Sequence, residues 1–113
     1  IVAISSGAAV HGARGWNAYS LSKASLNMLV DLYSKELPDT HIIALAPGLI
    51  DTNMQEYIYK YPDESKFSVV KKLRQAKGTP DMPAPDEAAK IISEAINKAS
   101  KHESGSFLDV RSM

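Results

Sequence analysis

The sequence predicts an α/β protein built on a parallel sheet, and three observations support this fold class. Residues 1–4 and 42–46 are short, continuous apolar runs, the pattern of strands that are buried on both faces. A helical stretch of about twenty residues lies between them, and parallel neighbouring strands need a crossover of that kind. Residues 106–110 are predicted to form another short strand that closes the chain.

The composition excludes several classes of protein. A chain of 113 residues with 44% hydrophobic side chains holds one small domain. Thirteen Lys and Arg balance thirteen Asp and Glu, so there is no basic field for nucleic acid. No apolar run approaches the ~20 residues that span a bilayer, so we expect no membrane partner. The absence of cysteine rules out disulfides and thiolate chemistry, and it fits the cytoplasm, where we expect the protein to be.

The first strand is followed by a loop. It ends at Ser5-Ser6-Gly7, and the small residues that follow, up to Asn17, predict a loop that carries part of a functional site.

The chain starts inside an apolar stretch and without Met, so we expect a fragment of a longer protein.

Residues 18–37 predict a long helix that ends before Pro38. Two apolar stripes run along this helix. The first, which we expect to face the sheet, comprises Leu26, Leu29, Val30, Tyr33 and Leu37. The second comprises Leu21, Met28 and Leu32. A single sheet covers one stripe, so we expect a neighbouring helix or another subunit to cover the other.

The rest of the chain alternates irregular and helical stretches. Pro47-Gly48 ends the second strand, and residues 49–84 are less regular, with an amphipathic stretch at 63–77 that Gly78 ends. Pro85-Asp86-Glu87 predicts the start of a helix, because proline and acidic residues suit its first turn.

Tyr19 and Lys23 are the first candidates for chemistry. Because they lie four residues apart, their side chains share one face of the predicted helix. A nearby ammonium favours the phenolate form, which helps a tyrosine to act as an acid or base near neutral pH. Tyr-x-x-x-Lys is common by chance in a chain with five tyrosines, so the pair gains its meaning from its context.

The context consists of residues at the ends of strands. Ser6 lies at the carboxyl end of the first predicted strand, 13 residues before Tyr19, and Thr52 follows the Pro-Gly pair after the second strand. Open α/β sheets bind ligands at the carboxyl ends of their strands. We therefore expect these residues and Lys23 to converge at one edge of the sheet.

These elements, in this order, resemble the short-chain dehydrogenase/reductase family. The resemblance covers the whole chain as the carboxyl-terminal half of the family's fold, a Rossmann-type doubly wound parallel sheet. It implies an NAD(P)-dependent carbonyl reductase or alcohol dehydrogenase that acts on a small-molecule carbonyl substrate. By the resemblance, Ser6 binds the substrate carbonyl, Tyr19 transfers the proton, and Lys23 assists the tyrosine and binds the nicotinamide ribose.

The resemblance also implies where the cofactor binds. Pro47, Gly48, Ile50 and Thr52 match the family segment that holds the nicotinamide carboxamide. The glycine-rich dinucleotide loop and the catalytic asparagine of the family are missing, and no G-x-G-x-x-G occurs here. We therefore expect the dinucleotide-binding half to be absent and the chain alone not to bind a dinucleotide.

Within the family, residues 15–19, 46–55 and 104–109 are most similar to sepiapterin reductase and bacterial benzil reductases. This similarity favours NADP as the cofactor, with NAD as the alternative. It places Asp109 where an aspartate anchors a pterin, although Asp109 equally suits a strand end. Four aromatic residues are candidates to line the substrate cavity, with packing or surface roles as the alternative: Trp16, Tyr57, Tyr59 and Tyr61. In the family the helix at 18–37 packs between subunits, so we expect a homodimer or homotetramer.

Other functions fit the sequence less well. A non-catalytic Rossmann-type binding or scaffold protein is the main rival, and the retained serine, tyrosine and lysine argue against it. A sugar-nucleotide epimerase normally has a larger carboxyl-terminal domain, and a serine hydrolase would need a G-x-S-x-G elbow. The three histidines have no ligand spacing, so we expect no metal. We expect a solvated helix face, rather than a phosphate clamp, from the basic residues Lys71, Lys72, Arg74 and Lys77.

Overall fold

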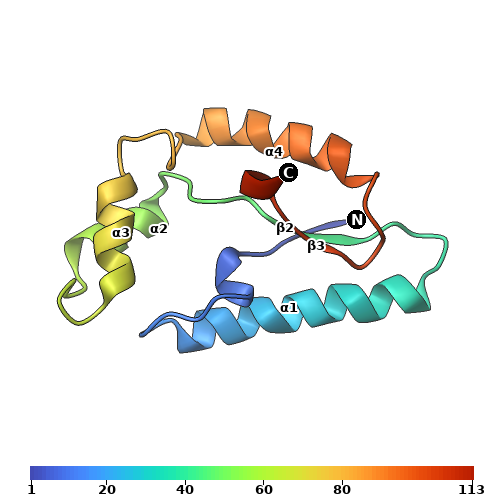
Figure 1. The fold of residues 1–113 in the computed structure, drawn as a ribbon, viewed down its shortest axis with the longest axis horizontal. Coiled ribbons are helices and arrows are strands. Elements are labelled where there is room, and N and C mark those ends of the chain that lie inside the picture. Colours follow the sequence, from blue (N-terminus) through green and yellow to red (C-terminus); the bar gives the residue numbers. More distant parts are fainter.

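The computed structural model describes residues 1–113 as a three-stranded parallel sheet with helices on both faces (Figure 1). The strands are β1 (Val2–Ile4), β2 (Ile43–Ala46) and β3 (Phe107–Asp109), in the order β1-β2-β3. Both neighbouring pairs are parallel, with Leu45 opposite Ile4 on one side and Leu108 on the other. The predicted α/β class and all three predicted strands are confirmed.

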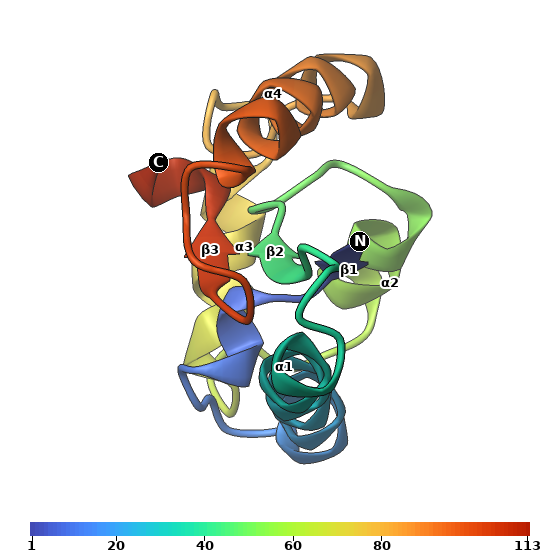
Figure 2. The ribbon, with the colours of Figure 1, turned by 90° about the vertical axis from the view of Figure 1, so that its right-hand side faces the viewer.

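Two long helices cover the sheet from opposite sides. Figure 2 shows α1 (Asn17–Glu36) on one face and α4 (Pro85–Ala99) on the other. Every residue of β2 is buried, and its side chains alternate between the two faces. One core cluster, on the α4 side, comprises Ile43, Leu45, Ala95 and Ala99. The other, on the α1 side, comprises Val30, Ile42 and Ala44.

The orientation of α1 differs from the prediction. Of the stripe expected to face the sheet, only Val30 is fully buried, while Leu29, Tyr33 and Leu37 are 42–50% exposed. Polar contacts explain the rotation, because the hydroxyl of Ser5, the residue after β1, donates to the Asn27 side chain. Near the other end of α1, a side chain on Gly105 would collide with Ser34, so the backbone approaches the helix closely there. The prediction that the first stripe packs on the sheet is therefore wrong for most of its residues.

Two shorter helices lie beyond the carboxyl ends of the strands, at the left of Figure 1. They are α2 (Asn53–Lys60), which was not predicted, and α3 (Ser68–Ala76). The predicted stretch at 63–77 becomes helical only from Ser68, because the Asp63 side chain accepts hydrogen bonds from Ser65 and holds a turn there. The Arg74 guanidinium ties α3 to the end of α2 by donating to the carbonyls of Tyr59 and Pro62.

The chain leaves a large part of its apolar surface open. Only 14 of 113 residues are buried, and Ile4, on the edge strand β1, is 47% exposed. The α1 face opposite the sheet exposes Leu21, Met28 and Leu32 at 52–69%. None of the helices combines the length and the apolar composition needed to cross a membrane.

Candidate active site

Ser6 lies directly beyond β1, at the start of a single 3-10 turn, Gly7–Ala9. Its hydroxyl oxygen accepts a hydrogen bond of 3.1 Å from the backbone N–H of Ala8. This contact fixes the oxygen while leaving the hydroxyl hydrogen free, because a serine hydroxyl can accept and donate at once. Ser6 can therefore donate a hydrogen bond to a ligand oxygen beyond the end of the strand.

Tyr19 and Lys23 occupy the first two turns of α1, as predicted from their spacing. The Lys23 ammonium donates a 2.8 Å hydrogen bond to the carbonyl oxygen of Ile4, the last residue of β1. It also lies 6.0 Å from the centroid of the Tyr19 ring. On the other side, Trp16 contacts the Tyr19 ring edge-on, with centroids 5.6 Å apart. The tyrosine ring is thus held between a cation anchored to the sheet and an aromatic neighbour.

The segment after β2 brings a second set of predicted residues to the same end of the sheet. Gly48 has a φ of +79°, a backbone conformation that favours glycine. Thr52 begins α2, and its backbone carbonyl accepts from the N–H of Gln55 while its side chain makes no capping hydrogen bond. Thr52 therefore has a free hydroxyl, and Ile50 lies between it and Gly48.

Asp109, at the carboxyl end of β3, is engaged by Arg111. Its carboxylate accepts two hydrogen bonds of 2.9 Å at Oδ1, from the backbone N and Nε of Arg111, and one of 2.6 Å at Oδ2 from Nη2. The hydrogen bond from the Arg111 side chain lowers the pKa of Asp109, against the opposing effect of partial burial. The Asp109 side chain is 18% exposed and that of Arg111 58%, so the guanidinium is the more accessible half of the pair.

A cavity of about 630 Å³ joins several of these elements. Ser6, Trp16 and Gly48 line it together with Ser20 and Arg111. Pro47 and Gly48 also border a second cavity, of about 460 Å³, on the side of α4. Tyr19, Lys23, Thr52 and Asp109 do not line the larger cavity themselves. Tyr19 precedes Ser20 and Asp109 pairs with Arg111, both of which do. The structure therefore gathers most of the predicted site at one edge of the sheet.

The three tyrosines of α2 and its end have packing and surface roles. Tyr57 and Tyr61 are 65% and 69% exposed and contact each other, with centroids 4.8 Å apart. The Tyr59 hydroxyl donates to the sulfur of Met82, and burial raises the pKa of Tyr59. None of the three lines the cavity that contains Ser6.

Three cationic residues of the cavity were not recognised in the sequence. Arg14, Lys72 and Arg111 all line it, and Lys72 does so although its stretch of the sequence predicts a solvated helix face. No spacing rule could have found them, because they come from a loop, from α3 and from the turn after β3. Phe67, just before α3, packs against Gly15 and so brings α3 close to the loop that holds Arg14.

The family comparison agrees with this architecture. The sequence pattern of the short chain dehydrogenase family matches residues 1–63, more than half of the chain. The chain therefore belongs to the short chain dehydrogenase family.

Individual relatives show which members of the family the chain resembles. The chain is 30% identical to benzil reductase ((S)-benzoin forming) of Bacillus subtilis over 115 residues, which is 98% of this chain and 46% of that protein. It is 39% identical to sepiapterin reductase of Rattus norvegicus over 56 residues, 50% of this chain and 21% of that protein. A solved short chain dehydrogenase/reductase from Saccharomyces cerevisiae matches with a TM-score of 0.76 and 26% identity, over 96% of this chain and 44% of that one. The chain thus spans about half the length of these full-length relatives.

The residues present fit one end of the family's NAD(P) cofactor. Gly48 offers a stretch of backbone without a side chain, Thr52 offers a free hydroxyl, and Lys23 offers an ammonium beside the end of β1. These groups suit the carboxamide and ribose of a nicotinamide nucleotide. The chain has no glycine-rich dinucleotide motif, so its own residues account for the nicotinamide end only.

Proposed function

We propose that this chain forms the catalytic half of an NAD(P)H-dependent carbonyl reductase of the short-chain type, in which Ser6, Tyr19 and Lys23 act on a ketone or diketone. The observation that carries the proposal is their placement. All three lie at the carboxyl end of β1, beside a cavity of about 630 Å³ that Ser6 itself lines. Similarity to benzil reductase over nearly the whole chain supports a diketone as the substrate.

In this mechanism the bound nicotinamide supplies a hydride to the carbonyl carbon. Ser6 donates its free hydroxyl hydrogen to the carbonyl oxygen and so stabilises the negative charge that develops there. The Tyr19 hydroxyl then gives its proton to this oxygen, which completes the conversion of C=O to CH–OH. One hydride and one proton are added, and solvent returns the proton to Tyr19.

Lys23 prepares Tyr19 for this step. Its ammonium is fixed by the Ile4 carbonyl and lies beside the tyrosine ring, so a phenolate formed during the reaction has a positive charge close by. The same ammonium would donate a hydrogen bond to the ribose of a bound nicotinamide nucleotide. We propose NADP as the cofactor, with NAD as the alternative, on the similarity to benzil and sepiapterin reductases.

The test compares two tyrosines of the same helix in the whole protein. Tyr19→Phe should lower turnover of an aryl diketone by about 10²–10⁴-fold, the usual contribution of a general acid. Tyr33→Phe is the matched control, because Tyr33 lies on α1 and is 50% exposed, far along the helix from Ser6. Binding of NADPH, followed by its fluorescence, should remain in both variants. Turnover of Tyr19→Phe equal to that of Tyr33→Phe would refute Tyr19 as the proton donor, whereas an unsubstituted protein that binds NADPH and turns over no carbonyl compound would favour the rival, a non-catalytic binding protein.

A pterin-like compound is a second candidate substrate. The observation that favours it is the 39% identity to sepiapterin reductase over half of this chain. In this version Asp109 exchanges part of its pairing with Arg111 for hydrogen bonds from an amino-pyrimidinone edge, for which a carboxylate is suited.

We also propose that the whole protein is a homodimer or homotetramer in the cytoplasm. The exposed Leu21, Met28 and Leu32 on α1 support an interface on that face, because a contiguous apolar surface of this kind is usually covered.

A further inference from the structure

The charged side chains that line the cavity beside Ser6 are all cationic. Its sixteen lining residues include Arg14, Lys72 and Arg111, together with His11, and not one aspartate or glutamate. The chain as a whole has no net charge, so this imbalance is local. We infer that the cavity takes a carbonyl compound that carries an anionic group, such as a carboxylate. The reaction in this inference rests on the proposed function, whereas the anion preference rests on the cavity itself.

Two of the three cations are free to bind a ligand. The structure has three salt bridges, and one of them neutralises Arg111 through Asp109. Arg14 and Lys72 take part in none of them. The Arg14 guanidinium lies 5.9 Å from the centroid of the Phe67 ring, which restricts it without cancelling its charge. An anionic ligand would therefore meet two uncompensated positive charges in the cavity.

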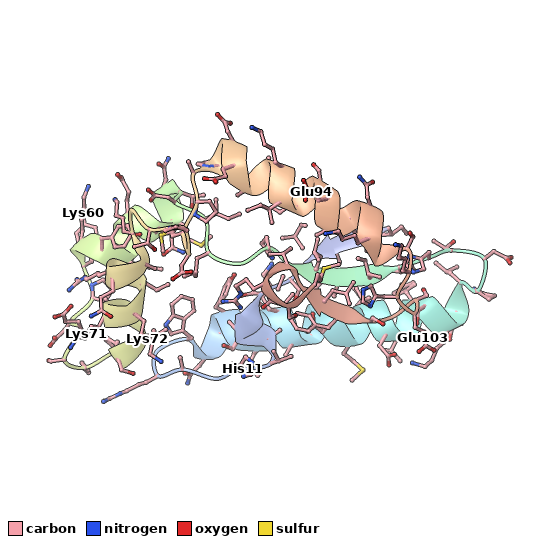
Figure 3. All side chains as sticks on the ribbon, turned by 45° about the horizontal axis from the view of Figure 1, so that its top comes forward. His11, Lys60, Lys71, Lys72, Glu94 and Glu103 are labelled. Carbon is pink, nitrogen blue, oxygen red and sulfur yellow. The ribbon has the colours of Figure 1, made fainter.

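The two cations without a salt bridge, Arg14 and Lys72, come from other elements than Ser6. Arg14 belongs to the loop before α1 and Lys72 to α3, whereas Ser6 lies at the end of β1. In Figure 3, Lys71 and Lys72 point away from α3 in different directions, with Lys72 on the side of His11. This arrangement places a substrate carbonyl at Ser6 and the anionic group of the same substrate towards α3.

The rest of the lining suits the body of such a substrate. Trp16, Leu49, Val69 and Leu73 supply apolar surface to the same cavity. A volume of about 630 Å³ lies within the ordinary range for small-molecule sites. The cavity thus combines a hydrogen-bond donor for a carbonyl, apolar surface and cationic side chains.

The first test is the selectivity of the whole protein between 4-carboxybenzil and its methyl ester. The two compounds share the diketone and differ in charge. Lys72→Gln should lower the ratio of kcat/KM for the acid to kcat/KM for the ester by about tenfold, the low end for losing a hydrogen bond to a charged group. Lys71→Gln is the matched control, because Lys71 is an exposed lysine of the same helix that does not line the cavity. An equal ratio in the two variants would overturn the inference.

The second test does not depend on catalysis. Trp16 lines the cavity and is the chain's one tryptophan, so its emission reports on the local field. Emission from Trp16 is isolated by subtracting the Trp16→Phe variant, and it is quenched with iodide, an anion, and with neutral acrylamide. At low ionic strength, Lys72→Gln should lower the iodide constant about twofold, the effect of one unit charge at several ångströms. Acrylamide quenching, and both constants in Lys71→Gln, should stay at their original values.

The two tests separate the two proposals. An iodide constant that does not respond to Lys72→Gln would refute the anion preference, whatever the protein reduces. A normal iodide response in a protein that reduces neither diketone would refute the proposed reductase and leave the anion preference of the cavity unrefuted.

Discussion

Replacing Gly15 with alanine should loosen the contact between the loop before α1 and the segment that leads into α3. Gly15 has a φ of +87°, which an alanine adopts at a cost of about 1–2 kcal/mol. A Cβ atom there would also lie 2.7 Å from Cε1 of Phe67, closer than real atoms approach. Relieving this overlap costs about 1–3 kcal/mol more, because either the ring or α3 has to move. The free energy of unfolding should therefore fall by about 2–5 kcal/mol.

The assay is denaturant unfolding of the whole protein, with the emission of the adjacent Trp16 as the probe. Gly12→Ala is the control, since Gly12 lies in the same loop and has no atom within 4 Å of an added Cβ. Because Phe67 directly precedes Ser68, which lines the cavity, Gly15→Ala should raise KM for a diketone more than it lowers kcat. Equal free energies of unfolding for Gly15→Ala and Gly12→Ala would refute the packing described here.

Four further predictions concern the site and its surroundings. Lys23→Met should abolish turnover and also weaken NADPH binding, measured by fluorescence titration, because the ammonium serves both the tyrosine and the ribose; unchanged binding would contradict this double role. Met28→Lys should convert the whole protein to smaller species in light scattering, and a monomeric original protein would refute the interface. Asp109→Asn should weaken the binding of a pterin-like substrate by about 1.5–3 kcal/mol and hardly affect the reduction of a small diketone. Equal losses with both substrates would leave Asp109 with a structural role only. Because Arg111 lowers the pKa of Asp109, the pair stabilises the fold above the ordinary carboxyl pKa of about 4. This stabilisation is lost as the pH falls through the lowered pKa. Asp109→Asn should therefore reduce the dependence of the free energy of unfolding on pH in this acidic range.

The sequence predicted the parts of the fold that short-range patterns determine. The continuous apolar runs became strands, and proline marked the end of the long helix within a residue or two. Helix α2 was not predicted because its apolar and polar residues lie opposite to the usual arrangement. Met54 and Tyr57 are exposed, and the buried residue is Gln55. An amphipathic pattern is readable only where the apolar side faces inward.

The rotation of α1 shows a second limit of sequence patterns. Its apolar stripes are real, but the side that meets the sheet contains Lys23, Asn27 and Ser34, because Lys23 and Asn27 bond to the end of β1 and Gly105 approaches Ser34 closely. Such polar contacts connect residues far apart in the chain, and no periodicity encodes them.

The candidate site likewise contains residues that the sequence could predict and residues that it could not. Ser6, Tyr19 and Lys23 could be placed together in advance, since strand ends and helical spacing fix their relative positions. Arg111 could not, because its role follows from a turn that folds its side chain back onto Asp109. The cationic lining of the cavity depends likewise on how α3 docks, which only the three-dimensional structure reveals.

The most direct measurement of the central claim is a double-mutant cycle on turnover between Ser6 and Tyr19 in the whole protein. If both hydroxyls act on one carbonyl oxygen, Ser6→Ala should cost about 10²–10³-fold in kcat and Tyr19→Phe about 10²–10⁴-fold. The double variant should then be no slower than the slower single variant, since residues that act as a unit are not additive. Losses that multiply in the double variant, or single variants that turn over at the original rate, would contradict a shared catalytic site at the end of β1.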